Sequence, residues 1–150
     1  MREILFRGKL TDDSKWVYGC LIDKIYGAVP AIMSEKSVDD AFNLEFEYDH
    51  VQEKTVGQYT GMKDKNGKQI FEGDIVIYDN TPYNAYGHRV TGVIVWHKWA
   101  WKCRYKEYVT TYHYAIGTED FFGAKSEVIG NHSSRLNRFV LAYHWLPPNQ

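Results

Sequence analysis

TVGQYTGMKDKNGKQIFEGDIVIYD, residues 55–79, carries the strongest local structural signal in the sequence. Asn66-Gly67 lies between two runs with apolar residues, and both central residues of a type I′ turn need the positive φ that Asn and Gly tolerate. The pattern therefore predicts a β-hairpin. A second turn, Glu72-Gly73-Asp74, leads into the β-branched run IVIY. A Gly-Asp turn before such a run is typical of small barrels, in which the chain bends sharply between sheets.

The segment before this hairpin also has the pattern of short strands. Apolar and polar residues alternate in MREILFRGK (1–9), the cluster TDDSK (11–15) is typical of a turn, and WVYGCLID (16–23) is rich in aromatic and β-branched residues. Two short strands around a turn predict an N-terminal hairpin. YGAVPAIM (26–33) predicts a third strand, in which Pro30 must lie at an edge or an end.

Two further elements are predicted between residues 34 and 54. Ser37 is suited to cap a short helix over residues 38–43, which has two aspartates in its first turn. Residues 44–49 alternate apolar and acidic side chains, which predicts a strand with one solvated acidic face. A composition change near residue 54 separates this acidic segment from the central hairpin and marks a soft domain boundary.

The segment after the central hairpin begins with a turn-rich, tyrosine-rich loop. Residues 91–117 then predict a long β region of two strands, with a break near Lys106-Glu107. SEVIGN (126–131) predicts one more strand. In the tail, apolar residues recur at helical spacing, and two prolines follow them. This pattern predicts a C-terminal helix, and a strand through RFVLAYHW is the alternative. The apolar residues are Leu136, Phe139, Val140 and Tyr143.

KWAWKCRYK, residues 98–106, interleaves aromatic and basic residues. In a continuous strand successive side chains face opposite ways, so Trp99 and Trp101 share one face with Cys103. We expect this face to be buried, because large aromatics dominate cores. The separation of aromatic from basic residues counts against a surface on which bases stack. A solvated basic face is favoured, and contact with phosphates or an acidic partner is the alternative. The residues that would make it are Lys98, Lys102, Arg104 and Lys106.

Composition limits the classes of protein that fit. The chain has 150 residues, 44% of them hydrophobic, which fits a folded domain with a core. Eighteen basic residues balance nineteen acidic ones, so the net charge of −1 lacks the excess of a dedicated nucleic-acid binder. Cys20 and Cys103 form no metal-binding or disulfide framework and are expected to be free thiols. No signal peptide or transmembrane run is found, so we expect a soluble, cytoplasmic protein.

The sequence contains no catalytic signature. GxSxG, HExxH and a phosphate-binding glycine-rich loop are absent, and no histidine has metal-ligand spacing. We therefore expect no enzyme activity, no metal and no cofactor. Asp74 could be read as a catalytic carboxylate, but a short acid after Gly more simply accepts backbone N–H bonds and fixes a turn.

VGQYTGMKDKNGKQIFEGDIV (56–76) resembles the central block of the YopX family of phage and prophage proteins. The start of the chain, with WVYG (16–19), and the later landmarks GVIVW (92–96) and EVIGN (127–131) are similar to that family in the same order. The resemblance runs from Met1 to about Asn131. It implies an SH3-like β-barrel in the second part of the chain with β-rich N-terminal elements, and it supplies no catalytic residues.

The sequence thus predicts a mainly β protein in three parts. These are an N-terminal β-rich lobe (1–54), an SH3-like barrel (55–131) and a C-terminal extension (132–150). We expect a non-enzymatic phage accessory protein that binds another macromolecule, either a protein partner or a second copy of itself. Twelve tyrosines and five tryptophans exceed what a small core readily hides, and interfaces favour these residues. Nucleic-acid binding through the basic strand face is the rival hypothesis.

Overall fold

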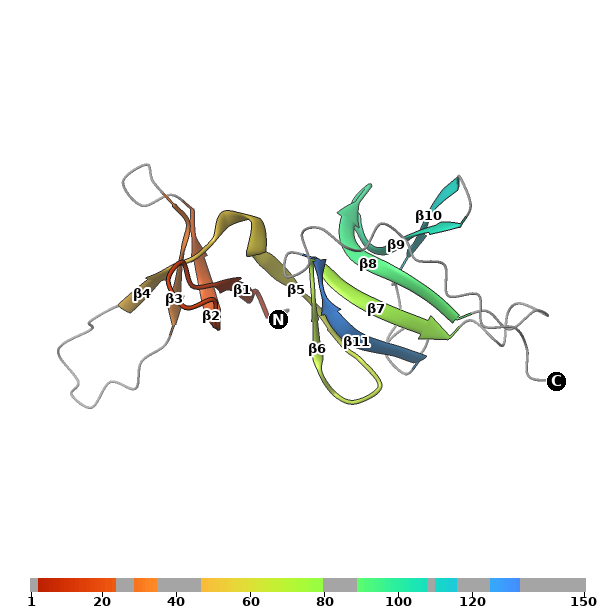
Figure 1. Ribbon diagram of the computed structural model, residues 1–150, viewed down its shortest axis with the longest axis horizontal. Coiled ribbons are helices and arrows are strands. Elements are labelled where there is room, and N and C mark those ends of the chain that lie inside the picture. The colour runs from red at the N-terminus through yellow and green to blue at the C-terminus, as the bar shows by residue number, and fades with distance from the viewer. Residues whose placement is uncertain are drawn as a thin grey trace.

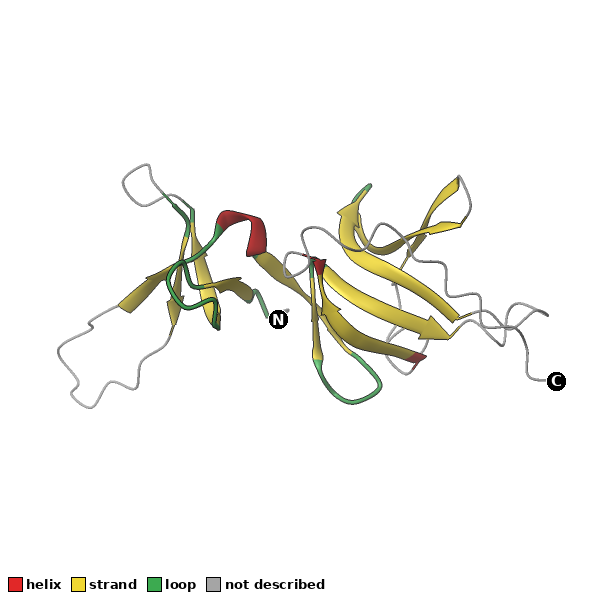
Figure 2. Cartoon of the chain, in the orientation of Figure 1, coloured by secondary structure: helices red, strands yellow, loops and turns green. Residues whose placement is uncertain are grey.

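The computed structural model of the chain describes residues 3–23, 29–34, 47–79, 89–107, 110–115 and 125–132. These residues form two antiparallel sheets (Figure 1, Figure 2), so the prediction of a mainly β protein is confirmed. The helix expected after Ser37 and the C-terminal helix or strand expected beyond residue 132 lie outside the described residues.

The first sheet has six strands in the order β4-β3-β2-β1-β5-β6. They are β1 (Phe6–Lys9), β2 (Trp16–Ile22), β3 (Ala31–Ser34), β4 (Glu47–His50), β5 (Gly57–Lys63) and β6 (Gln69–Phe71). The predicted N-terminal hairpin is confirmed, with Phe6 opposite Gly19 and a turn closed by the Leu10 N–H on the Lys15 carbonyl at 2.9 Å. Pro30 directly precedes β3, where its missing N–H costs no ladder bond.

The second sheet has five strands in the order β10-β9-β8-β7-β11. They are β7 (Asp74–Asp79), β8 (Arg89–His97), β9 (Ala100–Glu107), β10 (Thr110–Ala115) and β11 (Ser126–Asn131). The strand predicted at 126–131 is confirmed, and so is a break just after Lys106-Glu107. The prediction of two strands for residues 91–117 is wrong, because a second break at residues 98–99 makes three.

The central hairpin of β5 and β6 is confirmed, but its turn is not type I′. Of the two residues Asn66 and Gly67, only Gly67 has a positive φ, +80°, and its N–H donates to the Asp64 carbonyl at 2.9 Å. This is the type I turn followed by a left-handed glycine. The Asp64 carboxylate accepts the N–H groups of Asn66 and Lys68 at 2.8 and 2.9 Å, and these bonds hold Asn66 out of the left-handed region.

Asp64 also ties the central hairpin to the second sheet. Its other carboxylate oxygen accepts the Val128 N–H of β11 at 3.0 Å. Burial on its own raises the pKa of a carboxyl, but the N–H bonds from Val128, Lys68 and Asn66 lower the pKa of Asp64 below its ordinary value. A short acidic side chain thus fixes both the turn and the place where the hairpin meets β11.

The larger hydrophobic core draws on both sheets. Its buried members from β5 and β6 are Met62 and Ile70, and those from the second sheet are Val76, Tyr78, Ile94, Trp101, Cys103 and Val128. The β5–β6 hairpin therefore hydrogen-bonds with the N-terminal strands but packs its side chains against the second sheet. The described strands form no closed barrel, so the predicted SH3-like barrel is not confirmed. The limits 1–54, 55–131 and 132–150 likewise stay a prediction.

A buried ion pair joins the two sheets at the second predicted turn. The Arg7 guanidinium of β1 donates to the Asp74 carboxylate at the start of β7, and the two residues are only 5% and 1% exposed. The other Asp74 oxygen accepts the Phe71 N–H at 2.9 Å, which confirms that this acid fixes the turn around Gly73. Burial raises the pKa of Asp74 while Arg7 opposes that rise, and we expect the guanidinium to keep the carboxyl ionised at neutral pH.

Aromatic rings enclose the buried guanidinium. The Arg7 Cζ lies 4.4 Å from the centroid of the Trp16 ring and 4.5 Å from that of Phe71. Cation–π attraction is strongest where the cation is desolvated, as it is here. Arg7 and Asp74 are 67 residues apart in sequence. The pair is therefore a long-range connection between the N-terminal strands and the second sheet.

The two cysteines are free, as expected, and should differ sharply in reactivity. Cys20 is exposed, whereas Cys103 is 3% exposed and burial raises its pKa to about 12. The thiolate is the reactive form, so Cys103 should react only when the core opens. With a chromogenic thiol reagent at pH 8 we expect one thiol to react at once and the second roughly a thousandfold more slowly. Two fast thiols, or a slow one that persists in Cys103→Ala, would contradict the described core.

Candidate binding site on the β8–β9 hairpin

The KWAWKCRYK segment contains a tight turn rather than one continuous strand. β8 ends at His97 and β9 begins at Ala100, so Lys98 and Trp99 form a two-residue connection. Their φ values are 48° and 67°. Positive φ at both central positions is the type I′ geometry that matches the twist of a hairpin. We call Lys98 and Trp99 the hairpin tip.

The hairpin tip is strained by the residues that occupy it. Left-handed backbone costs an L-residue with a Cβ about 1–2 kcal/mol, and Asn and Gly are the usual occupants of such a turn. Trp99 is also 91% exposed, so its ring gains almost nothing from burial. A residue that is both strained and unburied does not serve the stability of this fold, and such strain is concentrated at functional sites.

The tryptophans beside the tip have different environments. Trp101 is 8% exposed and belongs to the core, as predicted. Trp96, opposite it in the ladder, is 48% exposed and meets the Trp101 ring edge-on at a centroid distance of 4.9 Å. The prediction that Trp99 shares the buried face is wrong, because the turn places it outside the alternation of β9. Trp96 and Trp99 together leave two large aromatic rings accessible at one end of the second sheet.

The four predicted basic residues do not form one row. Lys98 lies at the exposed tip, whereas Lys102 and Arg104 lie along β9, opposite Val95 and Val93 of β8. Lys102 is half-buried and Arg104 is exposed. Lys106 belongs to β9, and its side chain lies outside the described residues. Trp101 and Cys103 face the core while Lys102 and Arg104 do not, so the predicted alternation is confirmed within β9.

The hairpin has a strong local charge asymmetry. Residues 89–106 contain five basic residues and no acidic one, although the whole chain has a net charge of −1. In the described part of the chain, the ion pairs join Arg7 with Asp74, Lys15 with Asp13, and Lys65 with Glu127. The side chains of Lys98, Lys102 and Arg104 are thus not neutralised by any of these pairs. The site can offer accessible aromatic rings and positive charge to a partner.

The sequence patterns could not reveal the hairpin tip, because a Lys-Trp pair carries no turn signal. Tryptophans at alternate positions instead indicate a continuous strand.

Among the described residues, no group of three or more His, Cys, Asp or Glu is placed to hold a metal ion. Nor does any described helix have the length and apolar character needed to cross a membrane.

A comparison with protein families gives one finding. The family model described as YopX protein matches residues 5–134, which is most of the chain. No curated protein matches the chain significantly.

Proposed function

The chain belongs to the YopX protein family, and on this premise we propose that it is a non-enzymatic accessory protein that binds another macromolecule through the β8–β9 hairpin. The observation that carries the proposal is Trp99, which is 91% exposed on a backbone with φ of 67°. A large exposed aromatic residue is the type of side chain that dominates interface energetics. The proposed setting is the cytoplasm of a bacterium that carries a phage or prophage.

We propose that residues 55–131 adopt the SH3-like arrangement that the sequence predicts. Support comes from the shared core, in which Met62 and Ile70 of the β5–β6 hairpin pack with Val76 and Ile94 of the second sheet. In small barrels, a hairpin packs across a short meander, and the two sheets then share one core. Such folds host many functions, so the binding site and not the fold has to identify the function.

A protein is the leading candidate for the partner, and a second copy of the chain is one form of it. Immobilised wild-type protein should retain a specific macromolecule from the cells that make this chain, and Trp99→Ser should lose it. Tyr48→Ser is the matched control, because Tyr48 is 48% exposed on the first sheet, far from the tip in sequence. Mass spectrometry and sequencing of the retained material identify the partner. Equal recovery with all three proteins would contradict the proposal.

Self-association is tested separately by light scattering. If only monomer is found at micromolar concentration, self-association is ruled out.

Nucleic acid is the second candidate, and the charge of residues 89–106 is the observation that favours it. Exposed aromatics beside positive charge are what single-strand binders use, and the tip brings Trp99 and Lys98 together in one turn. The alternation that separates aromatic from basic residues in β9 therefore does not apply to the tip itself.

The nucleic-acid candidate predicts a steep salt dependence. If Lys98, Lys102, Arg104 and Lys106 each contact a phosphate of a single strand, affinity should fall about 50-fold between 50 and 200 mM salt. Fluorescence anisotropy with labelled single- and double-stranded DNA and RNA measures this. Reversal of the four charges to glutamate should abolish the binding. An absence of binding at 50 mM salt removes this candidate and leaves the protein partner.

A further inference from the structure

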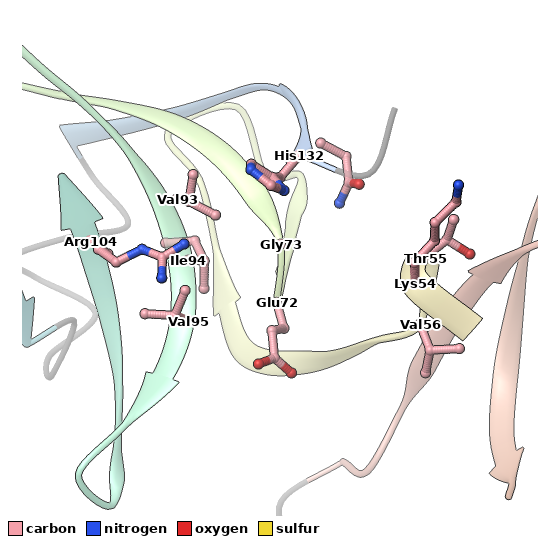
Figure 3. A pocket seen from close by; sticks show the side chains of 11 residues that line it. Lys54, Thr55, Val56, Glu72, Gly73, Val93, Ile94, Val95, Arg104 and His132 are labelled. Carbon is pink, nitrogen blue, oxygen red and sulfur yellow. The ribbon is translucent and has the colours of Figure 1, made fainter. Parts of the chain in front are cut away.

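A separate pocket of about 230 Å³ lies where the segment that enters β5 faces β8 and β9 (Figure 3). Valines form its apolar walls, with Val93 and Val95 from β8 and Val56 just before β5. The floor includes Gly73 in the turn between β6 and β7. Its N–H already donates to the Ile94 carbonyl at 2.8 Å, so this amide is not available to a ligand.

Three side chains that can carry positive charge line this pocket. Lys54 comes from the short helix η2 (Glu53–Thr55), Arg104 from β9 and His132 from the end of β11. Figure 3 shows the Arg104 side chain extending from β9 across β8, and the His132 ring at the opposite end of the pocket from the Glu72 carboxylate. Among the described residues that line the pocket, Glu72 is the one acid, so this part of the lining carries a net positive charge.

These charges are not neutralised within the described part of the chain. None of its ion pairs includes Lys54, Arg104 or Glu72. A charged side chain held beside apolar walls without a partner gains little from its position in the free protein. An anion that enters the pocket would meet Arg104, whose planar fork of N–H donors suits phosphate and carboxylate oxygens.

The size of the pocket limits the ligand. Sites for drug-sized molecules occupy about 300–1,000 Å³, and one water molecule takes about 30 Å³ of liquid volume. A pocket of about 230 Å³ therefore suits a small ion or a short organic molecule rather than a nucleotide. Lys54 and Arg104 exceed Glu72 by one positive charge. This surplus favours a doubly charged phosphate group over a singly charged carboxylate.

We propose that this pocket is a binding site for the phosphate group of a small ligand, with Arg104 as its main contact and Lys54 and His132 as supporting charges. The site is distinct from the hairpin tip, although Arg104 belongs to the same strand pair. Its ligand would be bound in the angle between the first sheet and the second, on the face of β8–β9 that carries Val93 and Val95.

The test is an NMR titration with inorganic phosphate at constant ionic strength. We expect saturable shifts of the Gly73, Val95 and His132 amides with a millimolar dissociation constant, and a much weaker response to acetate. Arg104→Met should weaken binding about tenfold or more, because it removes both the charge and the fork. Arg104→Lys should restore part of the affinity, since it keeps the charge alone.

Lys102→Met is the matched control, because Lys102 is a basic neighbour on the same face of β9 but does not line the pocket. It should change phosphate affinity less than about twofold, as expected for a partly exposed charge that does not line the site. Equal weakening by Lys102→Met and Arg104→Met would show general charge attraction and overturn the site. Shifts that do not saturate, or that acetate reproduces, would overturn it as well. Trp99→Ser should leave phosphate binding intact, so the pocket and the hairpin tip can fail independently.

Discussion

Asp74→Asn should lower the free energy of unfolding by about 3–5 kcal/mol, the largest loss that we expect from a single substitution. Asparagine keeps the size of the side chain and can still accept the Phe71 N–H, but it leaves the Arg7 guanidinium buried without a counter-charge. The loss is a large share of the roughly 5–15 kcal/mol by which a domain of this kind is stable. Urea denaturation followed by circular dichroism measures it.

The control is to remove both charges together. Replacement of a buried ion pair by apolar residues of similar volume is often neutral or stabilising. Arg7→Met combined with Asp74→Leu should therefore recover most of the stability that Asp74→Asn loses, although Phe71 then lacks an acceptor for its N–H. This recovery would show that the cost arises from the unpaired charge and not from the loss of one side chain.

A loss below about 1 kcal/mol for Asp74→Asn would contradict the ionised pair. Burial raises the pKa of Asp74, and a carboxyl that is already neutral would be replaced by asparagine almost without effect. The substitution therefore also measures which influence on this carboxyl is stronger at neutral pH, desolvation or the Arg7 charge.

Lys98→Asn combined with Trp99→Gly should make the protein more stable and weaken the proposed binding of a partner. Asn-Gly is the preferred pair for a type I′ turn, so the change relieves the strain of two left-handed residues. We expect the free energy of unfolding to rise by about 1 kcal/mol. Partner binding should fall at least about 30-fold, because an exposed tryptophan that acts as a hot spot contributes 2 kcal/mol or more.

Stability and binding have to be measured on the same preparation of this double variant. Urea denaturation gives the first, and the fraction of partner recovered on immobilised protein gives the second. A variant that is less stable than the wild type would show that Trp99 packs within the fold. Unchanged recovery would show that the tip is not the binding site. Either result would contradict the account of the hairpin tip.

The sequence predicts well those elements that local patterns specify. The hairpins at residues 1–23 and 55–79 and the strand at 126–131 have alternating side chains and turn residues, and all three are present. Asp74 was expected to fix its turn because short acids after glycine do so locally, and its bond to the Phe71 N–H shows this.

Features that depend on contacts between distant segments could not be predicted. Arg7 reads as a solvated charge of an N-terminal strand, and only the folded chain brings it to Asp74 between two aromatic rings. The turn at Asn66-Gly67 was assigned to the wrong type because the Asp64 carboxylate, which also bonds β11, captures the Asn66 N–H. Lys54, just before β5 of the first sheet, and Arg104 of the second sheet likewise meet around one pocket only in the folded chain.

The hairpin tip could not be predicted for a different reason. Local preference disfavours Lys98 and Trp99 in a left-handed turn, so a pattern-based reading continues the strand through them. Conflicts between local preference and observed structure are expected at functional sites. The strained turn at Lys98 and Trp99 therefore supports the proposal that the hairpin tip binds a partner.

Photo-crosslinking from position 99 shows directly whether the hairpin tip contacts a partner. Benzoylphenylalanine in place of Trp99 keeps a large aromatic group at the tip, and the same residue in place of Tyr48 is the control on the first sheet. After illumination in the cells that make the chain, we predict a discrete crosslinked species from position 99 and none from position 48. No adduct at position 99, or the same adducts from both positions, would contradict binding through the β8–β9 hairpin.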